Sequence, residues 1–358
     1  MEDHPNAPPA GADDTTVQRA RRMPKVLLHD HLDGGLRIPT LIELARQRGL
    51  ALPADDAETL SAWFDARAHA GSLVEYLRGF ALTVAAMASP QALERVAFEA
   101  AEDARADGCV LAEFRIAPLL FEAHGVAGEA AVEALLAGLR RSALPSGLIV
   151  CAMRQLDDAE IARAAQLALR YRGQGVVGFD LAGPEAGHPA TRHAALLARV
   201  REEGLPLTLH AGEADEGRRV VEAVRLGARR IGHGVRLADL IGTPEGQPLV
   251  DEVKAASAHL EVCPTSNVHT GAAASIARHP IRALWAAGLS LSFHTDNPLI
   301  SCLRQSDEAV RLVREAGFGW GDLVRMGLAA AEASFLPAPQ RLQAAQALRA
   351  WAVAEGLG

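Results

Sequence analysis

Eight short, nearly continuously apolar segments recur along the chain, and most are followed by a stretch with helical periodicity. This character is typical of parallel strands that are covered on both faces. The segments span residues 25–31, 109–118, 147–153, 176–182, 205–213, 230–234, 259–264 and 289–296. Their number and the intervening helices predict an α/β fold, a (β/α)8 TIM barrel. A doubly wound sheet is the alternative, but no G-x-G-x-x-G motif follows the first segment.

A helical insertion is predicted after the first strand. About 75 residues separate the first two strands, far more than a single crossover needs. Their periodicity predicts helices over residues 39–48, 58–66, 72–87 and 90–106. Ser72 and Glu75 have the spacing of a capping box for the third helix. We expect this insertion, about residues 36–106, to lie at the mouth of the barrel as a lid; simple cover for the barrel is the alternative.

The first 22 residues are acidic and rich in Pro and Ala, which predicts a disordered tail ahead of a single domain over residues 23–358. They contain no apolar stretch of the kind found in signal peptides. No later segment reaches the roughly 18–20 apolar residues that span a bilayer. The four cysteines lie far apart without a CxxC pair, as in proteins of reducing compartments. We therefore expect a cytoplasmic protein that does not bind membranes.

The charge pattern argues against a nucleic-acid partner. The chain has 36 basic and 44 acidic side chains, a net charge of −8, and no run of five or six like charges. A protein that coats nucleic acid needs a basic surface for phosphate contacts. A small-molecule substrate is the expected partner, and the sequence gives no indication of the oligomeric state.

Side chains that can bind metal or transfer protons lie at the ends of four predicted strands. They are His29 and His31 on the first, His210 and Glu213 on the fifth, His233 on the sixth, and Asp296 on the eighth. Strand alternation places His29 and His31 on one face. Barrel enzymes build their active sites at this end of the strands.

Three imidazoles and one carboxylate are ligands that zinc favours, which makes His29, His31, His210 and Asp296 the candidate metal ligands. A catalytic metal makes a bound water reactive near neutral pH. Glu213 and His233 remain for proton transfer. His294 is a competing ligand, but it lies two positions from Asp296, and we rank it second, as an outer-shell residue.

Six motifs occur in a characteristic order: HDHLDGGLR (29–37), GFDLAGPE (178–185), HAGE (210–213), RIGHG (230–234), CPTSN (263–267) and HTDNP (294–298). In this order and spacing the chain, from about Lys25 to Ala345, resembles the adenosine deaminase family of the amidohydrolase superfamily, especially its bacterial branch. The resemblance implies a barrel with one zinc ion per chain. It also implies attack on carbon 6 of an aminopurine nucleoside with release of ammonia.

The resemblance assigns further roles to individual residues. His233 would deprotonate the water, and Asp296 would accept a hydrogen bond from it. Glu213 would donate a proton to ring nitrogen 1, which requires a protonated carboxyl group. The substrate would be bound by Asp33 at the ribose hydroxyl, Gly183 at ring nitrogen 3 and Asn297 at ring nitrogen 7. A turn glycine is the alternative for Gly183, because it precedes a proline.

The chain departs from the family pattern at three places. Asn297 stands where many members carry a second Asp, but an amide can donate to ring nitrogen 7. His294 stands at a position that is more often Asn. Residues 115–121 read RIAPLLF, where bacterial members usually have a Tyr-containing segment. All three lie near the mouth and so concern the choice of substrate.

Adenosine and 2′-deoxyadenosine are therefore the leading substrates, with three alternatives. The first is a 6-aminodeoxyfutalosine deaminase of menaquinone synthesis. The second, less favoured, is an adenine deaminase, because similar enzymes tend to have IDHG where this chain has residues 231–234. The third is a catalytically inactive nucleoside-binding protein, which would lack a ligand, base or acid that this chain retains.

Overall fold

Eight parallel strands form a closed ring in the computed structural model, which describes residues 14–69 and 73–357. The strands are β1 (Lys25–His31), β2 (Cys109–Ile116), β3 (Ser146–Met153), β4 (Val176–Ala182), β5 (Thr208–Ala211), β6 (Arg230–His233), β7 (His259–Val262) and β8 (Ser290–Phe293). All eight predicted strands are present, and the last four are shorter than the apolar segments that predicted them. The polar residues of the motifs therefore lie in the last positions of these strands and in the loops that follow them.

The ring consists of two four-stranded runs, β1-β2-β3-β4 and β5-β6-β7-β8, that meet at two seams. At the first seam the amide of Phe179 donates to the carbonyl of Pro206 at 3.1 Å. At the second, the amide of His31 donates to Asp296 O at 2.7 Å, and the amide of Asp296 donates to His29 O at 3.0 Å. The predicted barrel is confirmed. Its second seam joins the backbones of three candidate metal ligands.

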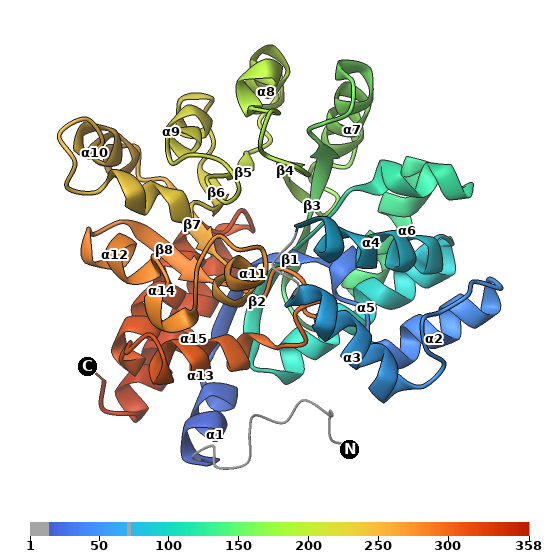
Figure 1. Cartoon of the computed structure of the whole chain (residues 1–358), viewed down its shortest axis with the longest axis horizontal. Helices are drawn as coiled ribbons and strands as arrows, with labels where there is room; N and C mark the ends of the chain where they lie inside the picture. The colour runs from blue at the N-terminus through green and yellow to red at the C-terminus, as the bar shows by residue number, and fades with distance from the viewer. Residues whose placement is uncertain (1–13, 70–72, 358) are drawn as a thin grey trace.

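Helices surround the strands as an outer ring (Figure 1). They are α6 (Gly128–Arg141), α7 (Asp158–Arg170), α8 (Ala194–Glu202), α9 (Arg218–Arg225), α10 (Gln247–Ala255), α12 (Ile281–Ala286), α13 (Gln305–Arg314), α14 (Trp320–Ala333) and α15 (Ala338–Ala354). Short 3₁₀ helices are η1 (Leu32–Gly34), η2 (Pro118–His124), η3 (Ala190–His193), η4 (Val235–Leu240) and η5 (Ile276–Arg278). The short helix α11 (Pro264–His269) projects onto the centre of the ring. None of the helices in the described ranges is long and apolar enough to cross a membrane.

The insertion after β1 contains the four predicted helices, α2 (Ile38–Gln47), α3 (Ala57–Ala68), α4 (Leu73–Met87) and α5 (Pro90–Ala106). Side chains cap two of them: Asp56 accepts from the amide of Thr59 at 2.8 Å, and Ser89 accepts from the amide of Ala92 at 3.1 Å. The predicted capping box of Ser72 and Glu75 lies outside the described residues. Movement of this insertion as a lid stays a prediction.

The predicted disorder of the N-terminal tail is wrong for its second half. Residues 14–22 form helix α1 (Asp14–Arg22), whereas residues 1–13 lie outside the described residues. The helix is docked: Ala20 is buried, and the Arg19 guanidinium lies 5.1 Å from the Trp320 ring and 5.8 Å from the Trp351 ring. The buried positions Ala20 and Met23 are three residues apart, a helical spacing that the Pro- and Ala-rich composition of the whole tail concealed.

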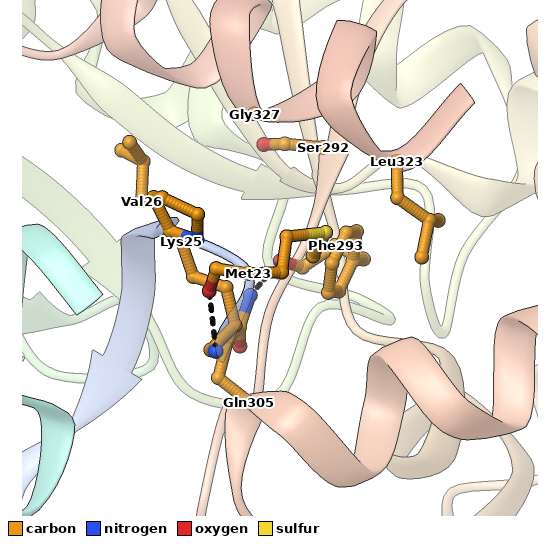
Figure 2. Close-up of a pocket in the computed structure, with 9 residues that line it drawn as sticks. Met23, Lys25, Val26, Ser292, Phe293, Gln305, Leu323 and Gly327 are labelled. Atoms are coloured by element: carbon orange, nitrogen blue, oxygen red, sulfur yellow. Dashed lines mark hydrogen bonds between the residues drawn. The ribbon is translucent and has the colours of Figure 1, made fainter. Parts of the chain in front are cut away.

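The amino end of the barrel is tightly sealed below α1. Lys25 is buried and donates to the carbonyl of Ala20 at 2.7 Å. It also donates to the carbonyl of Met23 at 2.8 Å, and Gln305 donates to Phe293 O at 2.5 Å (Figure 2). The cavity beside these residues has a volume of about 10 Å³, roughly one water molecule. This cavity has no room for a substrate.

The inside of the barrel is polar and charged. Arg230 of β6 contacts Glu113 of β2 at 2.6 Å, and Arg115 of β2 contacts Asp180 of β4 at 2.8 Å and Glu261 of β7 at 2.5 Å. These strands are not neighbours in the ring, so the side chains meet across its interior. All five side chains are fully buried. Barrels of this type are more often filled by branched apolar residues.

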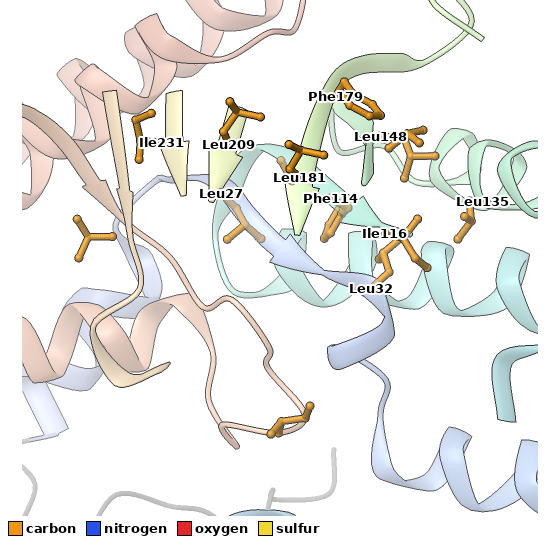
Figure 3. Close-up of a cluster of buried hydrophobic side chains, with 14 of the residues drawn as sticks. Leu27, Leu32, Phe114, Ile116, Leu135, Leu148, Phe179, Leu181, Leu209 and Ile231 are labelled. Atoms are coloured by element: carbon orange, nitrogen blue, oxygen red, sulfur yellow. The ribbon is translucent and has the colours of Figure 1, made fainter. Parts of the chain in front are cut away.

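The hydrophobic core accordingly lies between the strands and the helices. Leu148, Phe179, Leu209 and Ile231 are buried residues of four different strands in one cluster (Figure 3). Phe179 and Leu209 alternate along their strands with Asp180 and with residues that face the interior. This outer layer of apolar contacts is the main favourable contribution to folding.

Helices α5 and α6 pack closely at Gly138, which gives a stability prediction. A Cβ atom there would lie 2.2 Å from the carbonyl oxygen of Glu94 and 2.9 Å from the Ala97 side chain. Overpacking costs about 1–3 kcal/mol, against a gain of ~1 kcal/mol in helix propensity. We expect Gly138→Ala to lower the free energy of unfolding, measured by denaturant titration. Gly321→Ala is the control, because its nearest atom lies 3.8 Å away, and it should be neutral or stabilising.

Candidate active site

The four predicted metal ligands converge at the carboxyl ends of β1, β5 and β8. His31 Nε2 lies 3.3 Å from His210 Nε2. Asp296 Oδ1 lies 3.3 Å from His29 Nε2 and 3.5 Å from His31 Nε2. The ligand atoms of the three histidines all lie within 4.8 Å of one another. Residues 267 positions apart in the chain thus form one candidate metal centre.

The donor set fits a metal cation. His29 Nδ1 lies 2.8 Å from Glu261 Oε2, and its buried Nε2, which makes no hydrogen bond, faces Asp296 Oδ1 at 3.3 Å. Burial lowers the pKa of His29 to about 4, so the imidazole is neutral near pH 7 and Nε2 can donate its lone pair. His210 has the same arrangement, because its Nδ1 lies 2.9 Å from Asp180. Outer carboxylates of this kind orient metal-binding histidines.

Cys263 also lies close enough to His29 and Asp296 to be considered as a ligand. Burial raises the pKa of its thiol well above the usual value. A thiol must lose its proton to bind metal, so the histidine and carboxylate set is the better fit. Cys109, Cys151 and Cys263 are all buried free thiols.

Sequence reasoning missed the residues that hold the ligands. Arg115 donates to Asp180 at 2.8 Å and to Glu261 at 2.5 Å, so one guanidinium contacts both outer carboxylates. Burial alone would raise the pKa of Asp180, but His210 and Arg115 outweigh it and hold this pKa below its usual value. The available signal was the presence of charged residues inside strands that are otherwise apolar.

The candidate acid and base are neighbours. Glu213 Oε2 lies 3.4 Å from His233 Nε2. Asn267 donates to Glu213 Oε1 at 2.9 Å and lies 3.1 Å from His233 Nδ1, and Thr270 also donates to Glu213 Oε1 at 2.9 Å. His279 is buried, and its Nε2 lies 3.3 Å from Asn267 Oδ1. Asn267 and Thr270, on and beside α11, therefore fix the acid.

Two candidate catalytic residues have strained backbones. His233 and Asp296 both have φ of +63°, in the left-handed region that residues other than glycine rarely adopt. Such conformations cost about 1–3 kcal/mol each and cluster at functional sites. Gly183 has φ of +91°, and a Cβ atom there would lie 2.4 Å from Gln155 Oε1. The turn alone therefore explains why residue 183 is a glycine. A contact of the Gly183 backbone with ring nitrogen 3 of the purine stays a prediction.

The two remaining substrate candidates lie beside the metal centre. Asp33 follows β1 in η1, and its Oδ1 is buried with no hydrogen-bond partner, 3.9 Å from His31 Nδ1. Burial raises the pKa of Asp33 to about 7, so a polar ligand would offset the cost of burying it. Asn297 is buried against Gly34, where a Cβ atom would lie within 2.2 Å of its side-chain oxygen. Their roles in substrate binding stay predictions.

His294 is not among the converging atoms, in line with its lower rank as a ligand. Its Nδ1 accepts from the amide of Leu28 at 3.1 Å, and its Nε2 lies 2.6 Å from Ser292 Oγ. The imidazole thus links β1 to the chain after β8. His269 is buried on α11, where its ring packs 4.5 Å from that of His69 on the insertion.

Comparison with known proteins identifies the family. The family profile described as Adenosine deaminase matches residues 24–351. The chain belongs to the adenosine deaminase family. It is 45% identical over 341 residues to an adenosine deaminase of Mycobacterium sp. (strain KMS), covering 91% of this chain and 94% of the relative.

Two solved structures share the barrel. A zinc-bound amidohydrolase from Burkholderia ambifaria superposes with a TM-score of 0.83 at 24% identity, covering 98% of both chains. An adenine deaminase from Arthrobacter aurescens superposes with a TM-score of 0.80 at 25% identity, covering 92% of this chain and 99% of the other. The predicted family and the predicted barrel are both confirmed.

The contact between Asp180 and His210 gives a prediction about metal affinity. Loss of an outer carboxylate typically costs 10–100-fold in metal affinity. We expect Asp180→Ala to bind zinc about 10–100-fold more weakly than the parent, measured by competition with a chelator. Asp158→Ala is the matched control, because Asp158 also faces a histidine, His193 at 3.1 Å, but at the surface. Equal zinc affinity in Asp180→Ala and the parent would contradict the assignment.

Proposed function

We propose that the protein is a zinc-dependent hydrolase that converts adenosine and 2′-deoxyadenosine to the inosine nucleosides and ammonia. Membership of the family makes it an adenosine deaminase-type hydrolase. The observation that carries the proposal is the juxtaposition of a metal-capable histidine group with the Glu213–His233 pair. The nucleoside and the zinc ion are its expected small-molecule partners.

One zinc ion per chain would be held by His29, His31, His210 and Asp296. When bound, zinc supplies a Lewis acid that makes water nucleophilic near neutral pH. Glu261 and Asp180 would keep the ring nitrogens of His29 and His210 directed at the ion. Asp296 would also accept a hydrogen bond from the attacking water.

The chain's own residues would move the protons. His233 would accept a proton from the water whose oxygen bonds to carbon 6 of the purine. Glu213 would donate a proton to ring nitrogen 1, so that the electrons of the ring C=N bond move to that nitrogen. The bond from carbon 6 to the amino group then breaks, and the departing amine takes the proton held by His233. The new hydroxyl group on carbon 6 returns its proton to Glu213 as it becomes the 6-oxo group, so both side chains regain their starting states. Water and the aminopurine thus yield ammonia and the 6-oxopurine.

The surroundings of the metal centre favour a nucleoside. Asp33 has a buried oxygen without a hydrogen-bond partner, which a sugar hydroxyl would supply. Gly183 would present its backbone to ring nitrogen 3, and Asn297 would donate to ring nitrogen 7. A 6-aminodeoxyfutalosine deaminase uses the same chemistry and remains the alternative, ahead of an adenine deaminase. We further propose a cytoplasmic location and no nucleic-acid partner.

A panel of substrates tests the function. We expect ammonia release from adenosine and 2′-deoxyadenosine to exceed that from adenine, AMP and 6-aminodeoxyfutalosine. AMP should be poor, because a desolvated carboxylate at Asp33 repels a phosphate, and adenine should be poor because it leaves Asp33 without a partner. In Asp33→Ala the kcat/KM ratio of adenosine to AMP should fall. Greater activity on AMP or adenine than on every nucleoside would contradict the proposed role of Asp33 in binding the ribose.

The role of Glu213 gives a second test. An amide cannot deliver the proton that activates the ring, so Glu213→Gln should retain zinc and fold but lose about 10²–10⁴-fold in kcat. Glu216→Gln, on the same loop but exposed, should keep the parent activity. A loss below tenfold in Glu213→Gln would show that the carboxyl group is structural.

A further inference from the structure

We propose that Glu185 is a positioning residue that sets the place of Glu213 by binding the backbone of its loop. This inference rests on the proposed role of Glu213 as proton donor. Glu185 is buried and accepts hydrogen bonds from four consecutive amides after β5. The donors are Gly212 to Oε1, and Glu213 at 3.0 Å, Ala214 at 2.9 Å and Asp215 at 3.2 Å to Oε2.

Successive amides that point into one concavity form a nest with partial positive charge, which is complementary to an anion. Hydrogen bonds to a charged acceptor are roughly twice as strong as neutral ones. The loop has to turn sharply to build the nest: Gly212 has φ of +70°, and a Cβ atom there would lie 2.6 Å from Val220 Cγ2. The Glu185 carboxylate, which belongs to a different loop, therefore stabilises this turn.

The position of Glu185 at a seam of the barrel explains why such a link is needed. β4 and the chain before β5 share only the isolated bridge between Phe179 and Leu207, so no continuous ladder joins β4 to β5. Glu185 follows β4 by three residues and reaches across to the loop after β5. Its hydrogen bonds join the loop after β4 to the loop after β5, at the end of the seam where Glu213 lies.

Glu213 is thus held at both ends. Its backbone amide donates to Glu185, while its side-chain Oε1 accepts from Asn267 and Thr270. Loss of Glu185 leaves the side-chain contacts in place but releases the backbone. A misplacement of about 1 Å can cost on the order of 10²-fold in rate. The effect should fall mainly on kcat, since Asp33 and Asn297 come from other loops and the Glu185 side chain binds the loop after β5 rather than the backbone of Gly183.

Chemical rescue separates this role from a merely structural one. In Glu185→Gly we expect kcat for adenosine to fall about 10–100-fold while KM changes less than about threefold. Formate, acetate or propionate should refill the nest and restore at least about tenfold of the rate in a saturable way. Acetamide, which is neutral, should have no effect. Glu203→Ala, an exposed carboxylate on a different loop, should show neither loss nor response to carboxylates.

Hydrogen–deuterium exchange of a peptide over residues 208–217 provides a readout that does not depend on catalysis. Its amides should lose protection in Glu185→Gly and regain it with acetate, so failure of the proposed deaminase function would leave this result intact. Glu185→Gln replaces one acceptor oxygen by a donor that faces an amide, and its kcat should be intermediate. If Glu185→Gly does not fold, the kcat and the hydrogen–deuterium exchange of Glu185→Gln test the proposal.

Three results would overturn the proposal. One is a Glu185→Gly enzyme with at least half the parent kcat. Another is a loss of activity and protection that no carboxylate reverses in a folded Glu185→Gly protein. The third is a Glu185→Gln enzyme that matches the parent in both kcat and exchange.

Discussion

The contact of Arg115 with Asp180 and Glu261 is the interaction on which the centre of the molecule depends. One guanidinium bonds two carboxylates, and each carboxylate orients a histidine of the candidate metal site. All the charges are fully buried, where an unpaired ion would cost several kcal/mol. Loss of Arg115 would therefore leave Asp180 without its cation and Glu261 with Arg230 alone, and it would loosen the support of two imidazoles. The metal ligands and the barrel interior form one cooperative unit.

A charged interior contributes little net stability, because burying ions offsets most of their mutual attraction. The apolar layer between strands and helices, with residues such as Leu209 and Ile231, has to supply the stability instead. It also has to offset the strained backbones of His233 and Asp296, which cost about 1–3 kcal/mol each. Stability therefore comes mainly from the apolar layer between strands and helices, whereas the candidate catalytic residues lie inside the barrel and at the carboxyl ends of its strands.

The sequence predicted the strands and the converging residues because both have local signatures. His29 and His31 follow an apolar run directly, and strand ends of a barrel meet at one face. The sequence did not predict the contacts of Arg115 with Asp180 and Glu261, because a contact across the barrel has no fixed spacing along the chain. His279 was missed for the same reason, because only the packing of α11 brings it to Asn267. Helix α1 was missed because composition was averaged over a tail whose last residues have their own periodicity.

The candidate site straddles the two seams where the ladder of the barrel is interrupted. At one seam the backbones of His29 and His31 bond that of Asp296, and His294 replaces a carbonyl as acceptor for Leu28. At the other, Asp180 accepts from the amide of His210 at 3.2 Å. A continuous ladder would fix strand spacing by backbone geometry alone. Here a few backbone bonds are supplemented by side chains at both seams, so His294 and Asp180 help to set the distances between the strands that carry the ligands.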